Sequence, residues 1–267
     1  MGLMMGKKGI VMGIANDKSL AWGIAKALAE HGAQMVFSYQ SEILYKRVKP
    51  LAESIGDVEL IECDVTNDES LKNLFIKSEK KFGKIDFIVH AIAFSDKNEL
   101  TGKYFNTSRN NFLSTMDISC YSFTAVCRQA YDYLSDGASI LTLSYLGAER
   151  VMPNYNVMGV AKAALEASIK YLAMDFGNRN IRVNGLSAGP VKTLAASGID
   201  DFRYILKWNQ YNSPLKRNTT LEDIGGTAVF LLSDLSSGVT GEVVHTDSGY
   251  HVVGMKAVDA PDIATVD

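Results

Sequence analysis

The sequence predicts a single α/β domain built on a doubly wound parallel sheet of about seven strands. Three observations lead to this expectation. The chain has 267 residues, which is the size of one large domain. Short apolar runs alternate with helix-like stretches along almost its whole length. No internal repeat, low-complexity stretch or break in composition divides the chain, so we expect residues 1–267 to form one domain.

The apolar runs indicate strands that are buried on both faces, as a parallel sheet requires. They lie at 9–13, 33–38, 58–63, 85–91, 138–143, 181–186 and 242–246. Helical stretches lie between them at 20–31, 42–55, 68–82, 111–134, 153–177 and 221–233. Thr66 followed by Glu69 predicts a capping box that opens the third helix, and Gly83 is expected to end it. This alternation implies right-handed crossovers between the strands.

Two segments do not fit the alternation. Residues 93–110 are polar and rich in turn formers, and residues 188–220 follow the sixth strand and contain Gly189-Pro190. Both leave the carboxyl ends of strands, where open α/β sheets bind ligands. The stretch of about 190–220 is long for a connection, so we expect it to be partly helical and to act as a substrate-binding lid. The tail, about 250–267, has little periodicity and is expected to be loose or to pack on another subunit.

Composition excludes several classes of function. The net charge of -3 gives no sign of a nucleic-acid surface. No apolar segment approaches the length of a membrane span. Cys63, Cys120 and Cys127 form no CxxC pattern, which argues against a zinc site or a disulfide framework. We therefore expect a cytoplasmic protein with reduced thiols, no metal, no nucleic-acid partner and no membrane partner.

The residues in the turn after the first strand suit a dinucleotide-binding loop, although the turn lacks the GxGxxG pattern. Gly13 allows a sharp turn, and the following helix N-terminus offers free N–H groups to a pyrophosphate. Ser19 can add a hydroxyl, and Gly23 allows close packing of helix on strand. Read alone, the same residues also suit an ordinary connection between a strand and a helix. With the sheet, they favour a Rossmann-type fold.

The ends of the second and third strands bear on the choice of nucleotide. Gln40 is neutral, Glu42 is acidic, and the first base that follows is Lys46, so NADH is favoured over NADPH. Glu42 fits equally well as an exposed charge at a helix N-terminus. Asp64 can accept from an adenine amino group, while a turn or N-cap role suits it as well. Ile92 follows the fourth strand, where a backbone must approach a ribose.

Tyr155 and Lys162 are the residues that most directly suggest chemistry. Seven residues are two turns of helix, so both side chains lie on one face, about 10 Å apart along the axis. A phenol held there can donate to a carbonyl oxygen, and an ammonium can bind a sugar edge. Tyr145 lies ten residues upstream. These residues, next to a nucleotide loop, favour a nucleotide-dependent redox reaction.

Taken together, the motifs resemble the short-chain dehydrogenase/reductase superfamily, and within it the bacterial NADH-dependent enoyl-acyl-carrier-protein reductases. The resemblance runs to about residue 250 and is most specific at residues 141–150, 153–162 and 187–190. Carbonyl reductases of the superfamily carry Tyr-x-x-x-Lys, which occurs here only at Tyr45 and Lys49, far from the strand ends. The longer spacing of Tyr155 and Lys162 is that of the enoyl reductases.

The resemblance implies an activity and a set of site residues. It implies reduction of the trans-2 double bond of enoyl-acyl-carrier-protein thioesters in type II fatty-acid elongation, by a homotetramer. The catalytic residues implied are Tyr145, Tyr155 and Lys162. The implied cofactor contacts are Gly13, Ser19, Leu20, Gln40, Asp64, Val65, Ile92, Lys162, Val191, Lys192, Thr193, Leu194 and Ala195. The implied substrate contacts are Ser95, Tyr145, Tyr155, Met158 and Phe202.

Two positions depart from the family pattern. Ala93 stands where glycine is common, so sensitivity to the inhibitor triclosan is not implied. Asp200 replaces a base beside the substrate loop while Arg203 is kept, so carrier recognition is weaker there or moves to other lysines. Two rival functions stay open, namely reduction of a ketone or a free enone, and a non-catalytic sensor of the NADH/NAD ratio.

Overall fold

The computed structural model describes residues 2–193 and 202–263. Its centre is a seven-stranded sheet in which every pairing is parallel, with the order β3-β2-β1-β4-β5-β6-β7. The strands are β1 (Lys8–Met12), β2 (Gln34–Tyr39), β3 (Glu59–Glu62), β4 (Ile85–His90), β5 (Leu134–Ser144), β6 (Arg182–Ala188) and β7 (Val243–Thr246). The predicted doubly wound sheet is confirmed, and each predicted run overlaps a strand.

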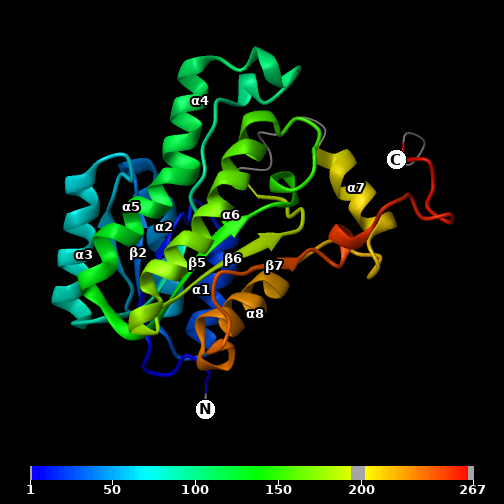
Figure 1. Ribbon diagram of the computed structural model, residues 1–267. Helices are drawn as coiled ribbons and strands as arrows, with labels where there is room; N and C mark the ends of the chain where they lie inside the picture. The colour runs from blue at the N-terminus through cyan, green and yellow to red at the C-terminus, as the bar shows by residue number, and fades with distance from the viewer. Residues whose placement is uncertain (1, 194–201, 264–267) are drawn as a thin grey trace.

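Helices cover both faces of the sheet (Figure 1). They are α1 (Leu20–Glu30), α2 (Glu42–Ile55), α3 (Asp68–Phe82), α4 (Arg109–Met116), α5 (Ser122–Ala130), α6 (Asn156–Phe176), α7 (Phe202–Asn212) and α8 (Leu221–Leu232). A π-helical turn, Asp117–Tyr121, joins α4 to α5. Thus the predicted helix at 111–134 is interrupted, and a helix does lie in the predicted substrate loop.

Two hydrophobic cores lie on opposite faces of the sheet because successive strand side chains point to opposite faces. Ile10 and Met12 of β1 pack in the core under α3, α5 and α6. Val11 packs in the other core, under α1, α2 and α8. Both faces of β1 are therefore buried, which explains its continuous apolar sequence.

The start of α3 differs from the prediction. Asn67, not Thr66, is the N-cap, and its side chain accepts from the Ser70 N–H at 3.0 Å. The Thr66 hydroxyl donates instead to Asp64 Oδ1 at 2.8 Å. The expected capping box of Thr66 and Glu69 is therefore wrong, because asparagine one residue later is at least as good a cap.

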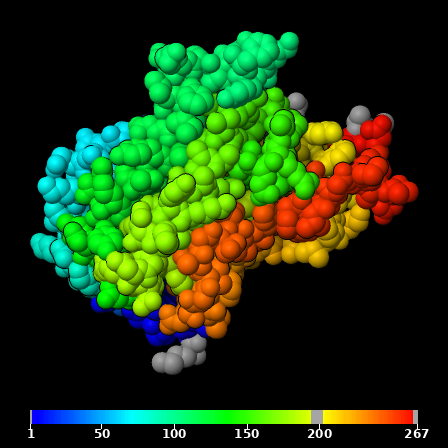
Figure 2. Space-filling model, viewed as in Figure 1, coloured from blue at the N-terminus to red at the C-terminus, as the bar shows by residue number. Residues whose placement is uncertain are grey.

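The tail after β7 packs on its own chain as far as it is described. In Figure 2 the C-terminal segment, drawn in red, lies along the yellow residues of the α7 region. Ala257 N donates to Asn212 Oδ1 at 2.8 Å, and Arg150 Nη1 donates to Val253 O at 2.9 Å. None of the helices in the described ranges has the length and apolarity needed to cross a bilayer.

Candidate active site and nucleotide site

The carboxyl ends of β1 and β4 form the switch point of the sheet, where chain connections leave in opposite directions. Gly13 lies there with φ +97°, a conformation that favours glycine. A Cβ on Gly13 would lie 2.0 Å from the carbonyl oxygen of Ala91. Both the turn and the close approach of the two strand ends therefore require glycine, which supports the interpretation of residues 13–19 as a ligand-binding loop.

Ser19 organises that loop. Its Oγ accepts from the backbone N–H groups of Ala15 and Asn16, each at 3.0 Å. No side chain caps the N-terminus of α1. The Trp22 N–H donates to the Ser19 carbonyl at 3.0 Å, whereas the N–H groups of Leu20 and Ala21 have no acceptor among the described residues. An anion bound at this end of α1 would meet those groups and the positive end of the helix dipole. Leu20 is the first residue of α1 and lies at this position.

Gln40 and Asp64 lie at neighbouring strand ends, since β2 and β3 pair in register up to Tyr39 and Glu62. The Thr66 backbone N–H, which donates to Asp64 Oδ1 at 2.9 Å, is the main cause that lowers the pKa of the Asp64 carboxyl; burial opposes it, and the Thr66 hydroxyl and Gln40 add smaller contributions. Asp64 therefore has a turn role, and its exposed side can still meet a ligand. Glu42 is exposed in the first turn of α2 and lies 3.7 Å from Lys46 Nζ, which favours its interpretation as a helix N-terminal charge.

The segment after β4 is held by a residue that the sequence did not single out. Ser119, fully buried in the π-helical turn, donates to Phe94 O and accepts from Phe94 N, each at 2.9 Å. Ser95 follows and donates to Asn111 Oδ1 at 3.3 Å. No sequence motif pointed to Ser119, because serines and threonines are frequent along this stretch and nothing distinguishes this one.

Tyr155 is the N-cap residue of α6, and Lys162 lies two turns further along. Asn154 and Asn156, on either side of Tyr155, have φ values of 54° and 33°, which non-glycine residues rarely adopt. Asn156 Nδ2 donates to Gly102 O at 3.2 Å, which ties this strained turn to the loop before α4. The surrounding structure therefore sets the direction of the Tyr155 ring.

The Tyr155 and Tyr145 rings meet edge to face, with centroids 5.0 Å apart. Tyr145 comes directly after β5, and Gly147 in the following turn is packed against the Tyr155 ring. Met158 lies in the same small cluster with Tyr155, Val157 and Leu100. The two predicted tyrosines and Met158 are therefore brought together.

Burial controls the protonation of the Tyr145 and Tyr155 phenols. It raises the pKa of the Tyr155 phenol well above its usual range, and Tyr145 and Glu166 add to the shift. Burial likewise raises the pKa of Tyr145, with a further contribution from Tyr250. Both phenols thus stay protonated near neutral pH and can donate hydrogen bonds.

Lys162 is buried, and its Nζ donates to the Leu143 carbonyl at 2.7 Å. Burial lowers the pKa of Lys162 to about 8, while Cys120 and Glu166 act in the opposite direction. The ammonium form is therefore still the larger fraction at pH 7. Glu166 is itself bound by the Ser144 hydroxyl, so a carboxylate one turn beyond Lys162 is fixed in place.

His90 is a packing residue at the end of β4. It is fully buried between the hydroxyls of Thr142 and Ser122, at 3.0 and 2.9 Å. Burial, together with the nearby Lys162, lowers the pKa of His90 to about 3. The imidazole is neutral at physiological pH, and both its nitrogens already have partners.

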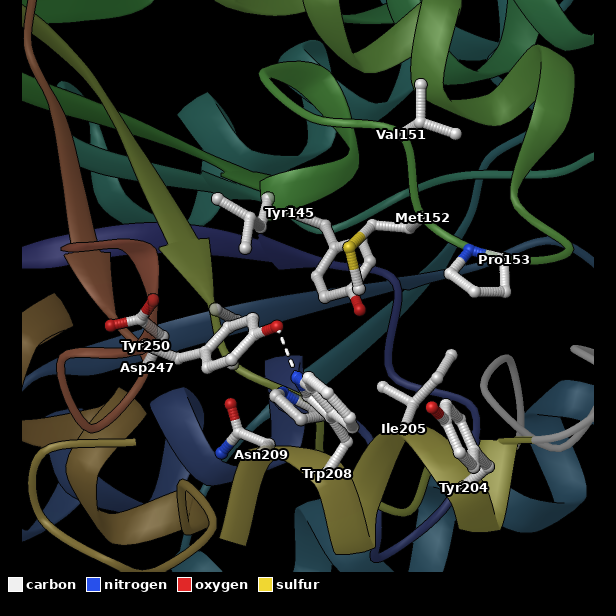
Figure 3. A pocket seen from close by; sticks show the side chains of 14 residues that line it. Tyr145, Val151, Met152, Pro153, Tyr204, Ile205, Trp208, Asn209, Asp247 and Tyr250 are labelled. Atoms are coloured by element: carbon white, nitrogen blue, oxygen red, sulfur yellow. Dashed lines mark hydrogen bonds between the residues drawn. The ribbon is translucent and has the colours of Figure 1, made fainter. Parts of the chain in front are cut away.

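A cavity of about 210 Å³ opens beside Tyr145 (Figure 3). Val151, Met152 and Pro153 border it on one side, and Tyr204, Ile205 and Trp208 of α7 border it on the other. Asn209, Asp247 and Tyr250 close one end, and residues 188–190 complete the wall. The lining is mostly apolar, so the cavity suits an apolar chain that leads away from the tyrosine pair.

Several predicted contacts lie elsewhere or outside the described residues. Phe202 begins α7 but does not line this cavity, nor does Met158. Val65 and Ile92 pack partly into the core at the ends of β3 and β4. Val191, Lys192 and Thr193 follow β6, with Lys192 exposed. Leu194, Ala195 and Asp200 lie outside the described residues.

Comparison with known proteins decides the family. Residues 13–251 match the family model described as enoyl-(acyl carrier protein) reductase. The chain belongs to the enoyl-(acyl carrier protein) reductase family. It is 66% identical, over 99% of its length and 97% of the relative, to "Enoyl-[acyl-carrier-protein] reductase [NADH] 1" of Rhizobium meliloti. It is 56% identical to the reductase of Rickettsia felis, over 95% of this chain and 97% of that one.

Solved structures of reductases agree with this assignment. One from Anaplasma phagocytophilum, in complex with NAD, has a TM-score of 0.93 and 60% identity, covering 98% of each chain. Another, from Bacillus cereus with NADP+ and an indole naphthyridinone, has a TM-score of 0.94 and 50% identity, covering 96% of this chain and 100% of that one. The Gly13 turn and the uncapped start of α1 in this reductase fit a dinucleotide of this kind.

Proposed function

We propose that this reductase converts trans-2-enoyl-acyl-carrier-protein thioesters to the saturated thioesters with NADH, the final reductive step of type II fatty-acid elongation. The observation that carries the proposal is the buried pair of Tyr155 and Lys162, two helical turns apart, beside Tyr145 and an apolar cavity. Tyr145 lines the cavity and contacts the ring of Tyr155, so a protonated phenol next to an apolar cavity suits a substrate that combines a carbonyl group with an acyl chain.

In the proposed reaction, Tyr155 acts on the substrate oxygen while the cofactor supplies the hydride. NADH supplies the hydride that reaches the β-carbon of the substrate. Tyr155 donates a hydrogen bond to the thioester oxygen, where negative charge develops, and its raised pKa keeps the donor proton in place. Loss of one such donor typically costs about 10²- to 10³-fold in rate. The α-carbon then takes a proton from solvent or through a tyrosine relay.

Lys162 and Tyr145 support this donor. The Lys162 ammonium, fixed by the Leu143 carbonyl, binds the nicotinamide ribose and favours polarisation of the phenol. Tyr145, edge-on to Tyr155 and at the cavity wall, orients the thioester or assists proton delivery. Met158, Ser95 and Phe202 are proposed as further substrate contacts.

The nucleotide contacts follow the strand ends. Gly13, Ser19 and Leu20 receive the pyrophosphate at the start of α1. Gln40, Asp64 and Val65 meet the adenosine. Ile92 and the segment 191–195 surround the nicotinamide side. After the end of β2 the first base is Lys46, and its Nζ lies 3.7 Å from Glu42 Oε1. This arrangement supports NADH over NADPH.

Assembly and location complete the proposal. We propose a homotetramer whose contacts use the helices near 111–134 and 153–177, since Tyr171 and Met174 of α6 are 77% and 83% exposed. The family resemblance implies an acidic acyl carrier protein as partner, and basic side chains would attract it. The basic residues proposed to dock it are Lys192, Arg203, Lys207 and Lys216. The three buried, unpaired cysteines suit the reducing cytoplasm.

The test is NADH oxidation with a crotonyl thioester, on coenzyme A and on the carrier protein, repeated with NADPH. We expect rapid NADH-dependent turnover that falls about 10²- to 10³-fold in Tyr155→Phe, with little change in NADH binding. Absence of turnover with either nucleotide on either substrate would remove the proposed activity. Full activity in Tyr155→Phe would remove the role of the phenol.

A further inference from the structure

The end of β7 and the segment that follows it join two parts of the candidate site. We call residues 245–257 the C-terminal brace. On one side it is tied to the turn that follows Tyr145, because His245 Nε2 lies 2.6 Å from Glu149 Oε1 and Arg150 donates to Val253 O at 2.9 Å. These bonds connect the brace to the loop that carries one of the two tyrosines.

On its other side the brace is tied to α7 and the turn after it. Trp208 Nε1 donates to the hydroxyl of Tyr250 at 2.7 Å, which Figure 3 shows as a dashed line. Leu215 N donates to Ser248 O at 3.2 Å. The brace therefore spans the distance between the Tyr145 loop and the helix across the cavity.

The backbone of the brace is bent so that Tyr250 reaches α7. Ser248 and Gly249 have φ values of 59° and 83°, and the Asp247 carboxylate accepts from the Gly249 N–H at 3.0 Å and the His251 N–H at 2.7 Å. The same carboxylate contacts the His251 ring. Asp247 is thus occupied in holding the bend, which leaves Tyr250 and Trp208 to shape this end of the cavity.

Trp208 and Tyr250 both line the cavity, and Trp208 is further fixed by stacking on Tyr204, with ring centroids 6.0 Å apart. We propose that the Trp208–Tyr250 hydrogen bond is a latch that fixes α7 as a wall of the acyl cavity, so that the C-terminal brace takes part in selecting the acyl chain. This inference rests on the proposed function, because it assigns the cavity to the acyl part of the substrate.

The chemistry of the lining supports an acyl chain as occupant. Leu146, Met152 and Ile205 contribute aliphatic side chains to the lining, and Tyr145, Tyr204, Trp208 and Tyr250 contribute aromatic rings. A long acyl chain would contact α7 along the cavity, whereas a short chain would end near Tyr145. The latch should therefore affect long substrates more than short ones.

The deciding experiment compares Tyr250→Phe with the matched control Tyr211→Phe. Tyr211 lies on α7 as well but does not line the cavity. With a dodecenoyl thioester we expect KM to rise about two- to tenfold in Tyr250→Phe, the effect of losing one hydrogen bond. In Tyr250→Phe the KM for a crotonyl thioester should rise less than the KM for the long substrate, and the KM for NADH should stay unchanged. Every constant of Tyr211→Phe should stay at its wild-type value.

Two further measurements separate the latch from general loss of structure. Trp208→Phe should also raise KM for the long substrate. The double variant Trp208→Phe/Tyr250→Phe should have a KM no higher than that of the more impaired single variant, because both substitutions remove the same hydrogen bond. Amide hydrogen exchange over residues 202–212 should become faster in Tyr250→Phe and not in Tyr211→Phe.

The outcomes are distinct. Equal KM values for the long substrate in wild type and Tyr250→Phe, or unchanged exchange of α7, would overturn the latch. A wild-type protein without enoyl reductase activity would instead contradict the proposed function, and the exchange measurement would still report on the hydrogen bond. An equal rise in KM for both chain lengths would overturn the role in chain selection.

Discussion

Gly147 offers a test of how closely the position of Tyr155 is set by packing. A Cβ on Gly147 would lie 2.3 Å from Tyr155 Cδ1 and 2.6 Å from Cε1. Ordinary contact begins near 3.4 Å, so the ring in Gly147→Ala must move by about 1.1 Å. The ring is buried against Val157, Met158 and Leu100, so the displacement is taken up by the phenol and its neighbours.

A displacement of this size at the donor oxygen should lower turnover strongly. Misplacement of a reacting group by 1 Å costs on the order of 10²-fold in rate. We therefore expect Gly147→Ala to reduce kcat with a crotonyl thioester by about 10²-fold, while the dissociation constant for NADH changes by less than about threefold. The assay is NADH oxidation, with NADH binding measured separately by titration.

The matched control is Gly226→Ala on α8, where an added Cβ meets no atom within 4 Å. Alanine is about 1 kcal/mol better than glycine within a helix, so this variant should be at least as stable as the wild type and fully active. If Gly147→Ala kept the wild-type kcat, the packing against Gly147 would not be what positions the phenol. A loss of NADH binding equal to the loss in kcat would point to a wider disturbance.

The remaining predictions concern the nucleotide turn and the buried lysine. Gly13→Ala should abolish measurable NADH binding, because the added Cβ would overlap the Ala91 carbonyl at a positive φ, and a titration that gave wild-type affinity would contradict this. The pKa of Lys162 is lowered to about 8 from 10.5, so between these values the unfolded chain holds a proton that the folded protein has lost. In that pH window the free energy of unfolding of the apo protein should rise with pH relative to that of Lys162→Met, by up to about 1.4 kcal/mol per pH unit. Urea unfolding at several pH values measures this difference. Parallel curves of unfolding free energy against pH for the two proteins would refute the prediction.

Periodicity and turn chemistry predicted most of the fold. The seven strands were placed within a few residues because short, continuous apolar runs that alternate with helices are typical of strands buried on both faces. Helix caps were harder to predict, as the N-cap Asn67 of α3 shows, because neighbouring residues compete for the same backbone N–H groups. The interruption at Asp117–Tyr121 was not predicted either, because the same apolar pattern serves α-helix and π-turn.

The candidate site was predictable where a motif carries it. Tyr145, Tyr155 and Met158 do lie together, and Gly13 has the backbone that its role needs. Ser119, and the pairing of Trp208 with Tyr250, could not be foreseen. Their partners are 25 and 42 residues away, and single polar contacts across such separations leave no pattern in one sequence.

The packing of α1 on α8 has a consequence for synthesis of the chain. Gly23 lies where a Cβ would be 2.9 Å from Leu221, and Gly225 where one would be 2.7 Å from Ala27, so the helix behind the nucleotide loop packs closely on the last long helix. At roughly 5–20 residues per second, α1 is made about 10 to 40 seconds before α8. A growing polypeptide on the ribosome therefore carries the loop but not its support, and only the nearly finished chain can hold the nucleotide.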